Sequence, residues 1–335
     1  MSKRFKTILQ YIIFLGFGLF LAWWSLKDLT ADDKSQIRDA VKNARYWLVV
    51  PVFIILILSH YVRAIRWRLL IESIGHHTTK TNAFFAVLIG YLANQAVPRL
   101  GEILKCTFLA RYEKVPADKL IGTIILERII DALCLLIVFG ITLMIQPDIY
   151  GKLIDAIFNG EDKHGDTKGI SSVLVTGIVA GLAILVIAIW MIKNKKTFAD
   201  LLNSIRKIGQ RIWNGVSAVQ HLKKRGQFLI YTLLLWGLYL SGGYLGFLAF
   251  QQTEQYGLKE AFTILSAGSV GMIVSPGGIG AYAYIIEKSM QVYGLNKGIA
   301  LAFGWILWLA QTAVIVLGGI ISFVFIPYYN KKRTS

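Results

Sequence analysis

Length, composition and charge place this chain in a membrane and exclude a soluble globular fold. The 335 residues are 55% hydrophobic and only 16% charged, and the mean hydropathy is +0.56. A soluble domain does not carry this much apolar surface. The formal net charge of +17 could indicate nucleic acid, but Lys and Arg gather between long apolar runs, where they set membrane orientation. We therefore expect membrane lipids as partners and no nucleic acid.

Six apolar segments are long enough to cross a bilayer as helices. A hydrocarbon core of about 30 Å needs roughly 20 apolar residues. The predicted spans are 7–26, 46–66, 119–145, 170–192, 227–250 and 297–325. The first span follows Lys3, Arg4 and Lys6 and resembles a signal peptide, but it is long and lacks a small-residue cleavage site. We expect it to be a retained helix.

Charge in the connecting segments predicts the orientation of these spans. Residues 193–226 form a basic linker, which contains nine Lys or Arg residues and a single acidic residue, Asp200. We place this linker in the cytoplasm, with 197–221 as an amphipathic helix on the membrane surface. The loop 146–169 balances its few Lys residues with acids and is predicted to be external. Both termini are basic, which predicts cytoplasmic ends and an even number of crossings.

Two further apolar stretches, 78–112 and 258–292, are each interrupted near the middle by Pro and Gly. The first break contains Pro98 and Gly101, and the second is Ser275-Pro-Gly-Gly-Ile-Gly280. Each arm has about fifteen residues, which is too short to span comfortably. We interpret both stretches as re-entrant helical hairpins, and eight complete but kinked transmembrane helices are the alternative.

The order helix, helix, hairpin, helix occurs twice in this assignment. Residues 1–145 and 170–325 then form two repeats of a single membrane domain, 1–335, and the charge assignment puts the two hairpins on opposite sides. The prediction is an all-α membrane helix bundle with six full spans and two broken hairpins in an inverted repeat. In transporters of this kind, broken helices meet near the midplane and form the substrate site.

Ionisable residues inside the apolar segments gather near the first break. The predicted group is Arg99, Glu102, Glu127, Arg128 and Asp131. Each costs about 2.5–3.5 kcal/mol to insert, so a group of them needs partners or a purpose. Glu127 and Asp131 share one helix face and need a cation between them, for which Arg99 is our candidate, with Arg63 and Arg66 nearby. A cradle for a polar head group and an ion-pair network that pins the hairpin are both consistent with this pattern.

The second break would free backbone groups inside the apolar stretch. The residues concerned are Ser275, Gly277, Gly278 and Gly280. The half-helix that follows presents its positive N-terminal end, which suits a phosphate. Glu287, two turns further on, could close this site or pair with Lys288. Cys106 and Cys134 have no second Cys or His at metal-ligand spacing, so we expect neither a metal nor a cofactor.

Three motifs together point to a known family. They are Asn94 through Glu102 with its Pro-Arg-x-Gly-Glu, Glu127-Arg128-x-x-Asp131, and Ser275-Pro-Gly-Gly-x-Gly280. As a set they resemble the lysylphosphatidylglycerol synthase transmembrane-region family, also described as flippase-like membrane proteins. The resemblance implies a protein of the bacterial or archaeal cytoplasmic membrane that helps to move lipids or lipid-linked head groups between leaflets. The family often has Glu where this chain has Ala283, and Glu287 is the residue that could replace it.

A lipid flippase or scramblase is therefore the expected function. Arg99 and the turn 277–280 would hold a phosphate, while Glu102, Glu127 and Asp131 would hold a cationic moiety or complete the network. Only ten residues follow the last predicted span, so we expect no aminoacyl-transferase activity. An integral membrane head-group or glycosyl transferase is one alternative, although no metal cluster, nucleotide signature or activated nucleophile favours an enzyme. A non-transporting assembly partner is another, and a homo-oligomer is left open.

Overall fold

The computed structural model describes residues 3–27, 29–97, 99–158 and 222–334, together with Gln210 and Val219. All regular elements in this part of the chain are helices. The predicted span 170–192 and most of the basic linker 193–226 lie outside the described residues.

The helices follow the predicted segments closely. In chain order they are α1 (Lys3–Lys27), α2 (Ala31–Lys42), η1 (Tyr46–Leu48), α3 (Val49–Ser73), α4 (Lys80–Ala96), α5 (Leu100–Glu113), α6 (Ala117–Ile145), α7 (Ile149–Phe158), α10 (Arg225–Phe247), η2 (Gln251–Thr253), α11 (Leu258–Val274), η3 (Pro276–Gly278), α12 (Ala281–Val292) and α13 (Lys297–Thr334). The predicted spans other than 170–192 coincide with α1, α3, α6, α10 and α13. The segment 146–169, predicted only as a loop, contains the helix α7.

Four described helices are long and apolar enough to cross a membrane. They are Tyr46–Ser73, Ala117–Ile145, Arg225–Phe247 and Lys297–Lys331. Their outer faces carry large exposed apolar side chains, such as Leu136, Met144 and Leu233. A soluble protein would not leave so much contiguous apolar surface in water. The chain is a multi-pass membrane protein.

Both predicted helix breaks are present. α4 ends at Ala96 and α5 begins at Leu100, with Arg99 in the left-handed region at φ 68°. Between α11 and α12, Gly277, Gly278 and Gly280 have φ values of 59°, 71° and 70°. Glycine adopts these angles without the Cβ clash that other residues suffer, so the glycines permit this turn.

Glycine also lets the two arms of each hairpin approach closely. A Cβ at Gly101 of α5 would overlap the Gly90 carbonyl of α4 and would lie 2.7 Å from the Asn94 side-chain oxygen. A Cβ at Gly271 of α11 would lie 2.6 Å from Cα of Tyr282 in α12. Backbone therefore packs on backbone in both hairpins, as is common where membrane helices associate through small residues.

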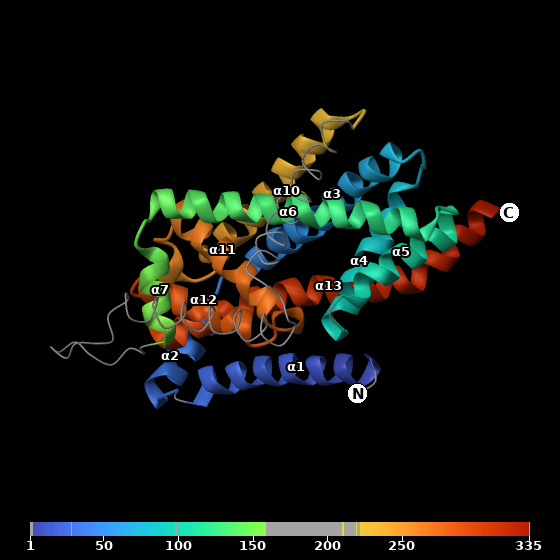
Figure 1. Cartoon of the computed structure of the whole chain (residues 1–335). Coiled ribbons are helices and arrows are strands. Elements are labelled where there is room, and N and C mark those ends of the chain that lie inside the picture. The colour runs from blue at the N-terminus through green and yellow to red at the C-terminus, as the bar shows by residue number, and fades with distance from the viewer. Residues whose placement is uncertain are drawn as a thin grey trace, which may run out of the picture.

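The two hairpins open toward opposite ends of the bundle. α5 ends at Glu113 and α6 begins at Ala117, so the first hairpin opens at the start of α6, which we call the first end. At the other end of α6, Gln146 Nε2 donates to the Lys259 carbonyl at 2.8 Å, so the second hairpin opens at this second end. α6 has 29 residues and is about 43 Å long. Figure 1 shows α4 and α5 at one end, α7 and α12 at the other, and α6 running between them.

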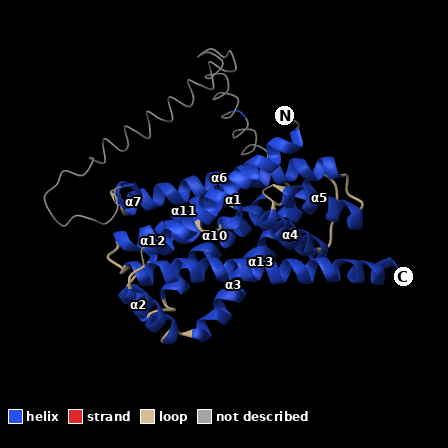
Figure 2. Cartoon of the chain, turned by 90° about the horizontal axis from the view of Figure 1, so that it is seen from below, coloured by secondary structure: helices blue, strands red, loops and turns tan. Residues whose placement is uncertain are grey.

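The packing of the helices has a two-fold pattern. α3 packs on α4, and α10 packs on α11, while α3 and α10 pack on each other. After its hairpin, α6 packs on α5 and reaches α11, just as α13 packs on α12 and reaches α4. Figure 2 shows α13 running the length of the bundle alongside α12 and α4.

The tips of the two hairpins lie next to each other. η3 contacts α4, and a Cβ at Gly277 would lie 3.5 Å from Cα of Gln95, near the end of α4. α1 covers the outer side of the second break, because a Cβ at Gly280 would lie 2.8 Å from the backbone nitrogen of Ala22. The two breaks are therefore neighbours, although they are far apart in the sequence.

The close approach at Gly101 predicts a specific stability defect. In Gly101→Ala the new methyl group meets the Gly90 carbonyl, and overpacking of this kind costs about 1–3 kcal/mol. Gly122→Ala in α6 is the matched control, since a Cβ there has nothing within 4 Å. Thermal unfolding in detergent should show a lower Tm for Gly101→Ala and an unchanged or higher Tm for Gly122→Ala. Equal Tm values for the two variants would contradict the packing described here.

Candidate functional site

A cluster of charged side chains lies inside the bundle beside the first hairpin. We call it the ionic cluster and define it as Arg63 and Arg66 of α3, Lys105 of α5, and Glu127 and Asp131 of α6. Glu127 is ten residues into α6, about 15 Å from its start. The cluster thus lies at a depth where the surrounding helices are apolar.

The two arginines of α3 bind both carboxylates of α6. Arg63 Nη1 donates to Asp131 at 2.6 Å and to Glu127 at 2.9 Å. Arg66 Nη2 donates to Asp131 at 2.6 Å and lies 3.4 Å from Glu127. Arg63 also donates to the hydroxyl of Tyr239 in α10, at 2.9 Å from Nη2. One guanidinium therefore ties α3 to α6 and to α10.

Lys105 brings the first hairpin into the cluster. Its Nζ donates to Glu127 Oε2 at 2.8 Å and lies 3.9 Å from the ring centroid of Trp67. Trp67 in turn donates from its indole nitrogen to Thr123 at 2.9 Å, so the ring is held in place. Glu127 is 1% exposed and Lys105 6% exposed, which keeps this ion pair away from solvent.

Helical spacing explains why these residues meet. Arg63 and Arg66 are three residues apart in α3, and Glu127 and Asp131 are four apart in α6, so each pair lies on one helix face. When these faces pack together, two guanidinium groups meet two carboxylates. A charge-assisted hydrogen bond of this kind is roughly twice as strong as a neutral one.

The ionic cluster carries more positive than negative charge. Three cations face two carboxylates, which leaves an excess of one positive charge within the cluster. Nε and Nη1 of Arg66 are buried and have no hydrogen-bond partner in the described part of the chain. Buried polar groups are normally hydrogen-bonded, and a buried charge is normally paired. The cluster is therefore electrostatically suited to an anion.

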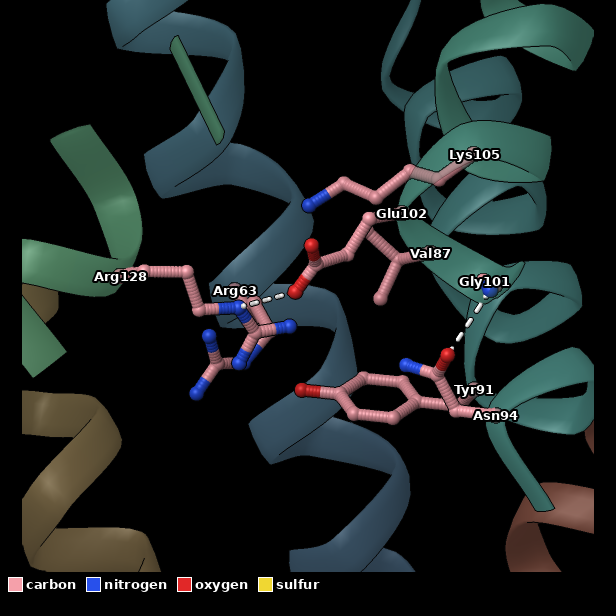
Figure 3. A pocket seen from close by; sticks show the side chains of 9 residues that line it. Arg63, Val87, Tyr91, Asn94, Gly101, Glu102, Lys105 and Arg128 are labelled. Atoms are coloured by element: carbon pink, nitrogen blue, oxygen red, sulfur yellow. Dashed lines mark hydrogen bonds and ion pairs between the residues drawn. The ribbon is translucent and has the colours of Figure 1, made fainter. Parts of the chain in front are cut away.

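A polar crevice leads from the cluster to the helix surface. It is lined by Arg63, Val87, Gly90, Tyr91, Asn94, Gly101, Glu102, Lys105 and Arg128. Figure 3 shows Arg128 and Glu102 facing each other across it, and their Nε–Oε1 distance is 3.2 Å. Their side chains are 44% and 38% exposed, so this pair forms the outer rim. The free interior is about 10 Å³, the room of roughly one water molecule.

The structure corrects the predicted role of Arg99. This residue lies at the turn before α5, and its exposed side chain makes no ion pair with Glu127 or Asp131. Arg63 occupies the place predicted for Arg99. The reason is geometric, because the left-handed turn at Arg99 leaves its side chain at the tip of the hairpin.

Other predicted residues of the first half line the crevice. Arg128 pairs with Glu102. Asn94 links the two helices on either side of the first break, because its side-chain oxygen accepts a hydrogen bond from the Gly101 N–H at 2.8 Å. Its position in the crevice wall agrees with a site beside the break.

Several of the backbone groups that we expected to be free at the second break are hydrogen-bonded. The Gly278 N–H binds the Ser275 carbonyl at 3.0 Å, and the Ser275 hydroxyl donates to the Ile279 carbonyl at 2.8 Å. Trp308 Nε1 of α13 donates to the Gly277 carbonyl at 2.8 Å. These bonds pair several of the turn's backbone groups, α1 and α4 contact the turn, and none of its residues lines the charged crevice. Glu287 is buried in α12, in the second hairpin.

Several site residues were not predicted from the sequence. Lys105, Tyr91 and Tyr239 all contact the cluster or line the crevice. A lysine within the apolar run Ile103-Leu104-Lys105-Cys106 is a signal that could have identified Lys105, because a cation there needs a buried partner. The two tyrosines carry no comparable signal. The described residues hold no group of three or more His, Cys, Asp or Glu that could bind a metal ion.

Removal of the shared carboxylate should destabilise the protein strongly. Glu127→Gln would leave three buried cations facing one carboxylate, and loss of one buried partner costs about 3–5 kcal/mol. Glu102→Gln, in the exposed rim pair, should cost about 1 kcal/mol or less. Adding Lys105→Met to Glu127→Gln restores the original charge excess and should recover part of the loss. Unfolding measurements in detergent test this order, and an equal loss for Glu102→Gln and Glu127→Gln would contradict it.

Comparison with known proteins agrees with this architecture. Over 129 residues the chain is 27% identical in sequence to the UPF0104 membrane protein MJ1595 of Methanocaldococcus jannaschii. The aligned stretch covers 38% of this chain and 36% of that relative. The match therefore spans about a third of the relative's length. No solved structure matches the chain. The family model described as the lysylphosphatidylglycerol synthase TM region matches residues 8–319, which include the hairpins, the ionic cluster and the crevice. The chain belongs to the lysylphosphatidylglycerol synthase TM region family.

Proposed function

We propose that this protein moves a lipid, or a lipid-linked head group, that bears a phosphate between the leaflets of the cytoplasmic membrane. The observation that carries the proposal is the excess positive charge of the ionic cluster, buried at the inner end of a polar crevice. A phosphate crossing hydrocarbon loses its water, and a positively charged, hydrogen-bonding crevice would replace part of that hydration. The acyl chains would stay in the lipid outside the crevice.

The arrangement of the hairpins supports alternating access. The hairpins open toward opposite ends of the bundle, and their tips meet at Gln95 and Gly277. We interpret them as re-entrant hairpins of an inverted repeat, in which a rocking motion exposes a central site first to one side and then to the other. The Gly contacts within each hairpin would let each hairpin move as one rigid unit.

The described conformation is closed, because a crevice with room for one water molecule cannot hold a head group. Opening requires α5 to move away from α6. The exposed Arg128–Glu102 pair spans these two helices and is weak by nature, so it can break at low cost. In the open state Arg128 would bind the phosphate of the lipid and would no longer pair with Glu102.

The charge of the first end supports its placement in the cytoplasm. Lys224 and Arg225, the last basic residues of the linker, lie at the start of α10, and Lys224 binds Glu72 near the end of α3. Figure 1 shows both chain termini toward this end. Positive residues in short loops favour the cytoplasmic side. The sequence has no P-loop, so we infer that a gradient or product removal sets any direction of transport.

A transport measurement tests the proposed function. The protein is reconstituted into vesicles with fluorescent phosphatidylglycerol, and a membrane-impermeant quencher reports lipid in the outer leaflet. Arg128→Met should slow transbilayer movement about tenfold or more, because the phosphate loses one charge-assisted contact. Arg111→Met is the matched control, because Arg111 is an exposed arginine of the neighbouring helix α5 that does not line the crevice, and this variant should transport normally.

The outcomes of this measurement separate the functional classes. Wild-type movement no faster than in protein-free vesicles, or equal rates for Arg128→Met and the wild type, would contradict transport through the crevice. Mass spectrometry of the recovered lipid is the second readout. A chemically altered head group would indicate a transferase in place of a transporter.

A further inference from the structure

A second cavity lies on the outside of the bundle at the first end. It has a volume of about 290 Å³, close to the lower limit of roughly 300 Å³ for small-molecule sites. α3, the first residue of α4 and the start of α10 form its walls. We call it the seam groove, because α3 and α10 belong to different halves of the chain and pack on each other.

The seam groove is separate from the crevice. Its wall in α3 includes Leu58, Val62, Ile65 and Leu69, which recur every three or four residues and form one stripe of the helix. Arg63 and Arg66 each follow one of these residues by a single position, which turns them about 100° around the helix axis. The groove and the ionic cluster thus use different faces of α3.

The groove is apolar along its length and charged at one end. From Leu58 to Glu72 it follows fourteen residues of α3, about 21 Å. Leu58, Ile65 and Tyr231 line the part deeper in the membrane, whereas Arg68, Glu72, Lys80, Lys224 and Gln227 line the part at the first end. This polarity matches a molecule with a polar head at the membrane surface and an apolar chain below it.

The charged end of the groove has an excess of cations. Glu72 is the single carboxylate among the residues that line the groove. It forms ion pairs with Lys224, at 2.8 Å, and with Arg68, at 3.5 Å. Arg68 Nε is also bound to the Thr78 carbonyl at 2.7 Å. Lys80 is exposed and makes no ion pair or hydrogen bond with any residue that the structure describes. Three cations and one carboxylate leave a net charge of +2 beside the lipid head-group layer.

We propose that the seam groove is a binding site for an anionic phospholipid. Lys80 and Lys224 hold the phosphate, and one acyl chain lies along the stripe of Leu58, Val62 and Ile65. The bound lipid touches both α3 and α10 and so stabilises the packing of the two halves. This site is distinct from the transport crevice, and its occupancy does not depend on whether the protein transports lipid.

Native mass spectrometry of the detergent-solubilised protein tests this proposal. The probes are dioleoylphosphatidylglycerol, dioleoylphosphatidylcholine and soluble glycerol phosphate. The wild type should retain phosphatidylglycerol in preference to phosphatidylcholine and should not retain glycerol phosphate, because the apolar chain contributes to binding. The double variant Lys80→Gln/Lys224→Gln should bind phosphatidylglycerol about tenfold less.

Two control variants, and one variant at the apolar end of the groove, locate the bound lipid. Lys223→Gln removes a neighbouring exposed charge that does not line the groove, and it should bind as the wild type does. Arg128→Met alters the crevice and should also bind normally, even where transport is slowed. Leu58→Trp narrows the apolar end of the groove at a residue that is 41% exposed, so it should fold and yet bind less phosphatidylglycerol.

Three results would overturn the assignment. Equal binding by the double variant and by Lys223→Gln would show that these two lysines do not hold the head group. Loss of the lipid in Arg128→Met would place it in the crevice. Equal retention of the two phospholipids would show that the charge of the groove does not select its ligand.

Discussion

The cost of burying charge inside a membrane governs the centre of this protein. Arg63, Arg66 and Lys105 are acceptable there only because Glu127 and Asp131 meet them at hydrogen-bond distance. These contacts join a helix, a hairpin and a second helix, so electrostatics fixes how α3, α5 and α6 pack. The balance is incomplete, since one positive charge remains in excess. In the function that we propose, this excess charge of the cluster also attracts an anionic head group.

The two hairpins share a backbone design but differ in chemistry. In both hairpins the two arms approach through glycine, and the two tips are neighbours. The first hairpin presents Lys105 to the cluster and Glu102 to the rim of the crevice. The second is closed by its own hydrogen bonds, by Trp308 and by α1. Among the described residues, the ionic cluster and its crevice therefore lie on the side of the first hairpin.

The sequence was sufficient to predict the long apolar helices that the structure describes and the two breaks, because these depend on local properties, whereas α2 and α7 were not predicted. Apolar length sets the spans, and Pro98, Gly277 and Gly280 mark where helices stop. The carboxylates Glu127 and Asp131 were found because a charge in an apolar helix is conspicuous. Their partner was misassigned to Arg99, since its nearness to a break says nothing of where its side chain points. Choosing Arg63 requires the packing of α3 on α6, which is a tertiary property.

The hydrogen-bond partners at the second break could not be predicted from the sequence either. A Gly-rich turn predicts freed backbone groups, yet Ser275 binds the Ile279 carbonyl and Trp308 binds the Gly277 carbonyl, and Trp308 is more than thirty positions from Gly277. Because buried polar groups are normally hydrogen-bonded, pairing of these backbone groups could have been expected, but this rule does not identify the residues that pair with them.

An experimental structure in a bilayer disc of anionic lipid tests the central claim most directly. If the excess charge of the ionic cluster serves to hold a phosphate, cryo-electron microscopy should show head-group density within hydrogen-bond distance of Arg63, Arg66 or Arg128, with α5 displaced from α6. A cluster that remains closed and without such density in every conformation captured, its charges bound only to one another, would contradict the claim.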